Sequence, residues 1–140
     1  MKITVIAVGK IKERYFTGAV EEYAKRLGRF CRLELLEVTD EKTPEGASEA
    51  QNIQIKEREG SRILKKLPAG AYVVALAIDG KMLDSPELSA AMERWKVGGA
   101  SHVVFVIGGS LGLSEEVLSR ADFRLSFSRM TFPHQLMRVI

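Results

Sequence analysis

The chain has 140 residues, of which 46% are hydrophobic and 28% charged, with a single cysteine and a net charge of +3. This length fits one domain, and the apolar content suffices for a core without disulfides or metal ions. The lone Cys31 excludes an intramolecular disulfide and favours a reducing compartment, so we expect a cytoplasmic protein. No apolar run approaches the roughly 20 residues that span a bilayer, and the N-terminus lacks the features of a signal peptide. We therefore expect a single domain over residues 1–140 that has no membrane partner.

The excess of positive charge lies in the N-terminal half of the chain. Lys10, Lys12 and Arg14 form a basic cluster soon after the first apolar run. This distribution suits a polyanionic partner such as RNA. A solvated surface of mixed charge gives the same pattern, and charge alone favours that plainer interpretation.

The first half of the chain is predicted to contain two strands and two helices. Ile3–Val8 and Leu33–Val38 are short β-rich runs and are predicted as strands. Arg14–Leu27 has apolar residues spaced for one helical face. Ser48–Leu67 is highly charged and is predicted as a solvated helix. Its apolar positions are Ile53, Ile63, Leu64 and Leu67.

The third quarter of the chain contains the clearest buried strands. Tyr72–Ile78 and His102–Ile107 are continuous apolar runs, typical of strands that are covered on both faces. Between them, Ser85-Pro86-Glu87 predicts a helix start, with Ser85 as the hydroxyl cap and proline at the first helical position. That helix is expected to end at Gly98.

The last quarter predicts two short helices around one strand. A helix of one or two turns is expected to start at Ser114, and Phe123–Phe127 is predicted as a strand. Pro133 is expected to open a final helix that runs through Val139. Strands and helices thus alternate along the whole chain, which predicts an α/β fold with a mostly parallel sheet sandwiched by helices.

Ligands of open α/β sheets bind beyond the carboxyl ends of the strands, and three strand ends here carry unusual residues. They are Asp79-Gly80-Lys81, the cluster Gly108-Gly109-x-x-Gly112, and the run from Ser128 to His134. The glycine cluster frees backbone groups for close approach by a flat ligand. It is neither the dinucleotide fingerprint nor a Walker loop, and by itself it is equally consistent with a tight turn.

Taken together, these segments resemble the SPOUT methyltransferases. The resemblance rests on Ile107-Gly108-Gly109, on the Gly112-Leu113-Ser114 helix start, and on the run Ser128-x-Met130-Thr131-x-Pro133-His134-x-Leu136-x-Arg138. It covers the whole chain. It is strongest to the family that methylates N3 of a pseudouridine in 23S ribosomal RNA of the large subunit.

The resemblance implies a fold, a cofactor and partners. It implies a C-terminal trefoil knot, a homodimer whose shared face lies next to the cofactor, and S-adenosylmethionine as methyl donor. The implied partner is 23S rRNA in the ribosome, and no metal is required or suggested by the ligand spacing. The family's cofactor contacts fall on Leu76, Gly108, Phe127, Ser128, Arg129, Met130, Thr131 and Phe132.

Two residues of the final segment are candidates for catalysis. His134 is a candidate general base or substrate contact, with a structural role at the helix start as the alternative. Arg138 lies one helical turn further, where it would grip a phosphate or neutralise the acceptor's anion. The alternative for Arg138 is an ion pair across the dimer. Arg129 is a further candidate for RNA contact.

The sequence stops at Ile140, inside the apolar helical run that starts at Pro133. Members of the resembling family continue this helix and end in a short tail near the active site. We therefore expect the C-terminal end to be truncated and the activity of this 140-residue form to be low. Restoring the tail without changing turnover would refute that expectation.

Two other functions stay open at this point. One is a Rossmann-like nucleotide-binding oxidoreductase, against which the missing ribose-binding acid argues. The other is a non-catalytic RNA- or ribosome-binding dimer.

Overall fold

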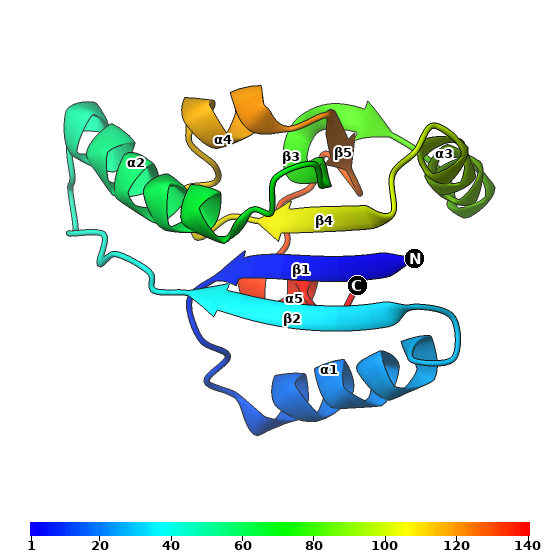
Figure 1. The fold of residues 1–140 in the computed structure, drawn as a ribbon. Coiled ribbons are helices and arrows are strands. Elements are labelled where there is room, and N and C mark those ends of the chain that lie inside the picture. Colours follow the sequence, from blue (N-terminus) through cyan, green and yellow to red (C-terminus); the bar gives the residue numbers. More distant parts are fainter.

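The computed structural model describes residues 1–140 and shows a five-stranded sheet surrounded by helices (Figure 1). All strands are parallel, and they follow the order β2-β1-β4-β3-β5. The strands are β1 (Lys2–Val8), β2 (Arg32–Val38), β3 (Tyr72–Met82), β4 (His102–Ile107) and β5 (Phe123–Ser126). The helices are α1 (Arg14–Leu27), α2 (Glu49–Lys66), α3 (Ser85–Val97), α4 (Glu115–Arg120) and α5 (His134–Met137). The predicted α/β fold with helices around a parallel sheet is confirmed.

Strand β3 is longer than the predicted Tyr72–Ile78, because it pairs with β5 in two stretches. Leu76 and Lys81 both lie opposite Leu125, with an irregularity between them. Gly80 approaches β5 so closely that a Cβ there would lie 2.8 Å from the carbonyl carbon of Arg124. The Asp-Gly turn signal therefore marks a bulge within the strand, where the sequence pattern predicts its end.

Three details of the helices also differ from expectation. Asp84, one residue before the predicted Ser85, caps α3: its Oδ1 accepts from the N–H of Glu87 at 2.8 Å, and Glu87 Oε2 accepts from the N–H of Asp84 at 2.8 Å. Helix α5 ends at Met137, before the predicted Val139. In α2, Ile53 is 44% exposed, whereas Ile55 is buried.

The two faces of the sheet carry separate apolar clusters, because alternate residues of a strand point to opposite faces. On one face, Ile6, Val104 and Val106 pack with Ile63 of α2 and Val117 of α4.

On the other face, Val74, Val103 and Leu125 pack against side chains that include Trp95 of α3. The Trp95 ring stacks on Tyr72 with centroids 4.7 Å apart. The strands predicted to be covered on both faces are indeed buried along Val73–Ala75 and at most positions of β4.

Helices α1 and α5 are covered far less than α2. Neither contains a buried residue, whereas α2 buries four. Figure 1 shows α1 beside the β2 edge of the sheet and α5 behind β1 and β2. None of the helices combines the length and the apolar character needed to cross a membrane.

Candidate active site

A cavity of about 580 Å³ lies at the carboxyl ends of β3, β4 and β5. This is where parallel α/β sheets bind ligands, and the volume is typical of a small-molecule site. Three segments form it: the bulge of β3, the turn after β4, and the chain between β5 and α5. Its lining residues are Leu76, Ala77, Ile78, Ile107, Gly108, Gly109, Ser110, Leu111, Gly112, Leu125, Ser126, Phe127, Ser128, Met130, Thr131, Phe132, Pro133, His134 and Met137.

The turn after β4 forms the first wall, which we call the glycine loop (residues 108–112). It closes through a bridge in which the N–H of Gly112 donates to the carbonyl oxygen of Gly109 at 3.0 Å. Gly112 has a φ of +87°, which favours glycine. A Cβ on Gly108 would lie 2.8 Å from the Gly112 carbonyl carbon, so the two backbones meet only because no side chain intervenes.

The segment after β5 forms the second wall, which we call the C-terminal wall (residues 127–132). Its bend is held by two serines. Ser126 Oγ donates to the Ser128 carbonyl oxygen at 2.9 Å, and Ser128 Oγ accepts from the N–H of Met130 at 3.0 Å. Phe127 is 42% exposed and Met130 is 74% exposed. Large apolar side chains are thus presented at the cavity without a cover from the rest of the chain.

Seven of the eight residues expected to contact a cofactor line this cavity. Arg129 is the exception: it is exposed and does not contribute to the lining. Leu76 is the one expected residue that comes from an earlier strand. It lines the cavity at the point where the irregularity of β3 begins. The structure therefore brings together residues that are more than 50 positions apart in the sequence.

His134 lines the same cavity from the first turn of α5. Burial lowers the pKa of His134 below its usual value of 6.5, and the guanidinium of Arg138 lowers it further. The Asp40 carboxylate acts in the opposite direction but does not outweigh them. The imidazole is therefore neutral at pH 7 and able to accept a proton.

Arg138 does not line this cavity, because its guanidinium is engaged at the carboxyl ends of β1 and β2. Nη1 contacts Glu37 Oε2 at 2.6 Å, and Nη2 donates to the carbonyl oxygens of Val8 at 2.9 Å and Gly9 at 2.6 Å. The side chain is 7% exposed, and Nε has no hydrogen-bond partner. Arg138 thus forms an ion pair with Glu37 within the chain, whereas the alternative considered from the sequence was an ion pair across a dimer.

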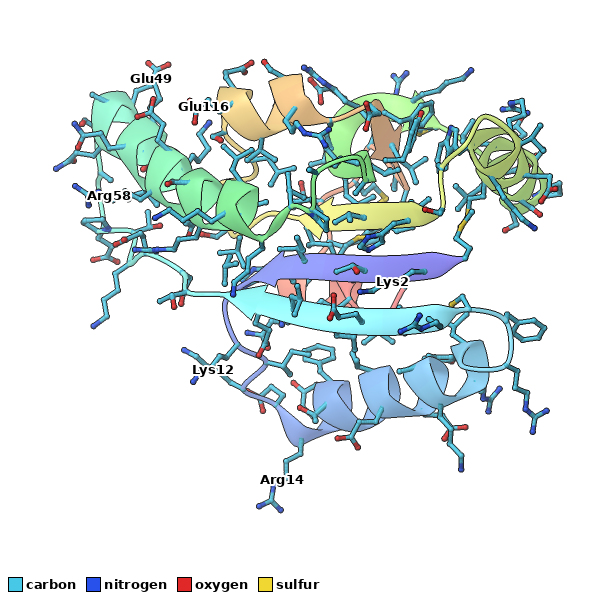
Figure 2. The ribbon with its side chains drawn as sticks, viewed as in Figure 1. Lys2, Lys12, Arg14, Glu49, Arg58 and Glu116 are labelled. Carbon is cyan, nitrogen blue, oxygen red and sulfur yellow. The ribbon has the colours of Figure 1, made fainter.

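The basic cluster lies next to α5. The N–H of Lys12 donates to Gln135 Oε1 at 3.3 Å, which places the segment after β1 against this helix. Figure 2 shows the side chains of Lys12 and Arg14 extending outward from that segment and from the start of α1. The cluster is exposed and lies near the helix that carries His134, as an RNA-contact surface would require.

Sequence reasoning missed several lining residues. Ser110 and Leu111 lie inside the glycine loop, so the spacing of its glycines was the available signal. Met137 follows His134 by three positions and therefore shares its helical face. No group of three or more His, Cys, Asp or Glu side chains is arranged to hold a metal ion.

Known proteins match the whole sequence. Residues 1–140 match the family described as "Predicted SPOUT methyltransferase". The chain is 60% identical to "Ribosomal RNA large subunit methyltransferase H" of Bifidobacterium animalis subsp. lactis, over 100% of this chain and 88% of that relative. Proteins of the same name from Bifidobacterium adolescentis and Clostridium kluyveri are 57% and 55% identical, with the same coverage. This protein belongs to the SPOUT methyltransferase family.

Proposed function

We propose that this protein transfers a methyl group from S-adenosylmethionine to N3 of a pseudouridine in 23S rRNA of the large ribosomal subunit. The proposal is carried by the full-length match to ribosomal RNA large subunit methyltransferases at 55–60% identity. The cavity at the carboxyl edge of the sheet supplies a site of suitable size for the cofactor. The ribosome as substrate makes the cytoplasm the proposed compartment.

The residues of the cavity fit S-adenosylmethionine. Ten of its 19 lining residues are hydrophobic, which suits the faces of an adenine ring and the cofactor's methyl group. The glycine loop offers backbone N–H and C=O groups at close range, and such groups can recognise the polar edge of adenine. When bound, the cofactor supplies an electrophilic methyl group for direct displacement. We assign its binding to Leu76, Gly108 and the residues of the C-terminal wall other than Arg129.

We assign His134 the role of accepting a hydrogen bond or proton from the acceptor base. Its side chain lines the cofactor cavity, and its lowered pKa keeps it neutral at pH 7. A neutral imidazole next to the reacting N3–H can polarise that bond in the transition state. Arg129 is exposed beside the cavity and is our candidate for contact with an RNA phosphate.

We assign Arg138 the role of holding α5 in position against the sheet. Its guanidinium already has three partners, in β1, in β2 and at Gly9 directly after β1, so a phosphate would have to replace them. By tying α5 to the sheet, Arg138 fixes the helix that presents His134 and Met137 to the cavity.

We further propose that the protein works as a homodimer whose shared face includes α1 and α5. Neither helix buries a residue within one chain, although both carry large apolar side chains. Tyr15 is 68% exposed, and Ile140, beyond α5, is 58% exposed. A second copy would cover this apolar surface. The trefoil-knotted path of the chain stays a prediction from the family resemblance.

Calorimetry with S-adenosylmethionine, S-adenosylhomocysteine and NAD tests the cofactor assignment. We expect binding of the first two ligands and none of NAD; binding of NAD alone would favour the oxidoreductase alternative. Methyl transfer to ribosomes that lack the modification then separates an enzyme from a dimer that only binds RNA. Binding of ribosomes without methyl transfer would contradict the proposed reaction.

A further inference from the structure

A buried carboxyl group on α2 lies behind the glycine loop and has no part in the mechanism above. Glu59 is 5% exposed, although the charge of α2 predicts a solvated helix. Its Oε2 accepts a hydrogen bond from the N–H of Glu41 at 3.0 Å. Carboxyl groups are rarely buried without a specific partner, so this placement calls for an explanation.

The Glu59 carboxyl supports the glycine loop directly. A Cβ built on Gly109 would lie 3.1 Å from Oε1 and 3.4 Å from Oε2 of Glu59. The same Cβ would lie 3.3 Å from Val8 Cγ1, so the Glu59 carboxyl group and Val8 both pack close to Gly109, and the absence of a side chain permits this approach. Gly109 in turn lines the cofactor cavity, whereas Glu59 does not.

The next residue of α2 fixes the far end of the same turn. A Cβ on Gly60 would collide with Ser114 Oγ and would lie 3.2 Å from Val117 Cγ2. Ser114 is buried and caps α4 by accepting from the N–H of Val117 at 3.3 Å. Adjacent residues of α2 thus hold the glycine loop at Gly109 and the start of α4 at Ser114.

The other oxygen of Glu59 connects this support to the loop after β2. Glu41, whose N–H it binds, also forms an ion pair with Arg62, and Arg62 Nη1 donates to the Thr39 carbonyl oxygen at 2.9 Å. Arg62 therefore holds the same loop but makes no contact that restrains Gly109. The chain thus contains a natural control for the role of Glu59.

We propose that Glu59 is a positioning residue that holds Gly109, and with it the glycine loop, in the geometry that binds the cofactor. This inference rests on the proposed function, because the ligand of the loop is S-adenosylmethionine. Glu59 acts through its packing against Gly109 and does not line the cofactor cavity. Burial raises the pKa of Glu59 above 4.5, and the nearby Asp40 carboxylate adds to the rise, while the Glu41 N–H and Arg62 oppose it.

Three variants separate this role from a general loss of structure. Glu59→Leu removes both oxygens, Glu59→Gln keeps an acceptor of the same length, and Arg62→Met releases the loop after β2 while leaving Glu59 in place. Calorimetry on the whole chain measures the Kd of S-adenosylmethionine and of S-adenosylhomocysteine. We expect Glu59→Leu to raise both constants about tenfold, in equal proportion, because a branched side chain cannot pack against Gly109 as the planar carboxyl group does. Glu59→Gln and Arg62→Met are expected to stay within about twofold of wild type.

Hydrogen exchange in the absence of cofactor provides a second and independent measurement. Amides of residues 109–114 should exchange faster in Glu59→Leu than in Arg62→Met or wild type. Exchange in Glu59→Leu at the wild-type rate would overturn the proposal. A loss of affinity in Glu59→Gln as large as that in Glu59→Leu would also overturn it. So would a larger loss in Glu59→Leu for S-adenosylmethionine, which is cationic, than for S-adenosylhomocysteine. If wild type binds neither ligand, the proposed function fails, while the exchange result still decides whether Glu59 positions the loop.

Discussion

The glycine loop and the C-terminal wall line one cavity but are held in place in different ways. The glycine loop packs against Glu59 of α2 and Val8 of β1 and leads into a buried cap of α4, so its position is set by residues distant in sequence. The C-terminal wall is held by two local hydrogen bonds, of Ser126 at the end of β5 and of Ser128, and presents Phe127 and Met130 to solvent. Segments with few buried contacts open more easily than segments packed into a core. We infer that the glycine loop is formed before the cofactor binds, whereas the C-terminal wall is completed by the cofactor or a second subunit.

The largest effect is expected when one methyl group is added to the glycine loop, and this change tests whether the loop is formed before the cofactor binds. Gly108→Ala would place a Cβ 2.8 Å from the Gly112 carbonyl carbon, and neither backbone can yield without opening the loop. Overpacking of about 1–3 kcal/mol corresponds to a loss of cofactor affinity of up to about 100-fold. Calorimetric titration with S-adenosylmethionine measures it. Gly18→Ala is the matched control, because a Cβ on Gly18 in α1 meets nothing within 4 Å. Wild-type affinity in Gly108→Ala would show that the loop is not preformed.

The second prediction concerns Arg138, which directly follows α5 and anchors this helix to the sheet. Arg138→Met removes the contacts that tie α5 to Val8, Gly9 and Glu37. We expect the free energy of unfolding to fall by about 2 kcal/mol, because buried carbonyl groups lose their donors. Urea denaturation measures this loss. Arg26→Met, which breaks the exposed pair with Glu22, should cost less than about 0.5 kcal/mol. Unchanged stability in Arg138→Met with abolished methyl transfer would instead favour direct contact between Arg138 and RNA.

A third test uses the exposure of the C-terminal wall. Met130→Ala should leave the free energy of unfolding within about 0.5 kcal/mol of wild type, because the side chain is 74% exposed. The same change should weaken S-adenosylmethionine binding by about five- to tenfold, since the cofactor would lose an apolar contact. Val97→Ala on α3, where the side chain is 80% exposed, should alter neither quantity. A large loss of stability in Met130→Ala would mean that the C-terminal wall is already packed without its ligand.

The smallest expected effect is the pH dependence that His134 contributes. Its folded-state pKa lies below the usual value of 6.5, so the unfolded chain takes up a proton more readily than the folded one. Stability therefore falls as pH drops below 6.5 and through the lowered pKa, and it is unaffected by this group at higher pH. As the pH falls from 7.5 to 5, the unfolding free energy of wild type should decrease relative to that of His134→Asn. A constant difference would show that His134 is not buried beside Arg138 in solution.

Sequence reasoning located the elements well because most of them have strong local signals. Helix α1 and strand β4 have the expected bounds, since apolar spacing and continuous apolar runs depend only on near neighbours. The β3 bulge could not be foreseen, because it arises from pairing with β5, which lies more than 40 residues further along the chain. The predicted cap of α3, Ser85, differs by one residue from the observed cap, Asp84, because aspartate and serine are both favoured at this position.

The family resemblance predicted which segments would form the cavity. It did not predict the contacts that hold those segments in place. The residue types of the glycine loop and of the run from Ser128 to His134 predicted where a ligand would lie. They could not indicate that Glu59, in a helix full of exposed charges, is buried behind Gly109. They also could not indicate that Arg138 points to the ends of β1 and β2, because both contacts join residues about 100 or more positions apart.

The most direct test of the central claim follows a labelled methyl group. The protein is incubated with methyl-labelled S-adenosylmethionine and ribosomes that lack the modification, and the labelled nucleotide is identified by mass spectrometry of digested 23S rRNA. We expect label on N3 of a pseudouridine, above the level given by the Gly108→Ala variant. Label at another nucleotide would contradict the proposed substrate, and no label above that variant would contradict the proposed methyltransferase activity.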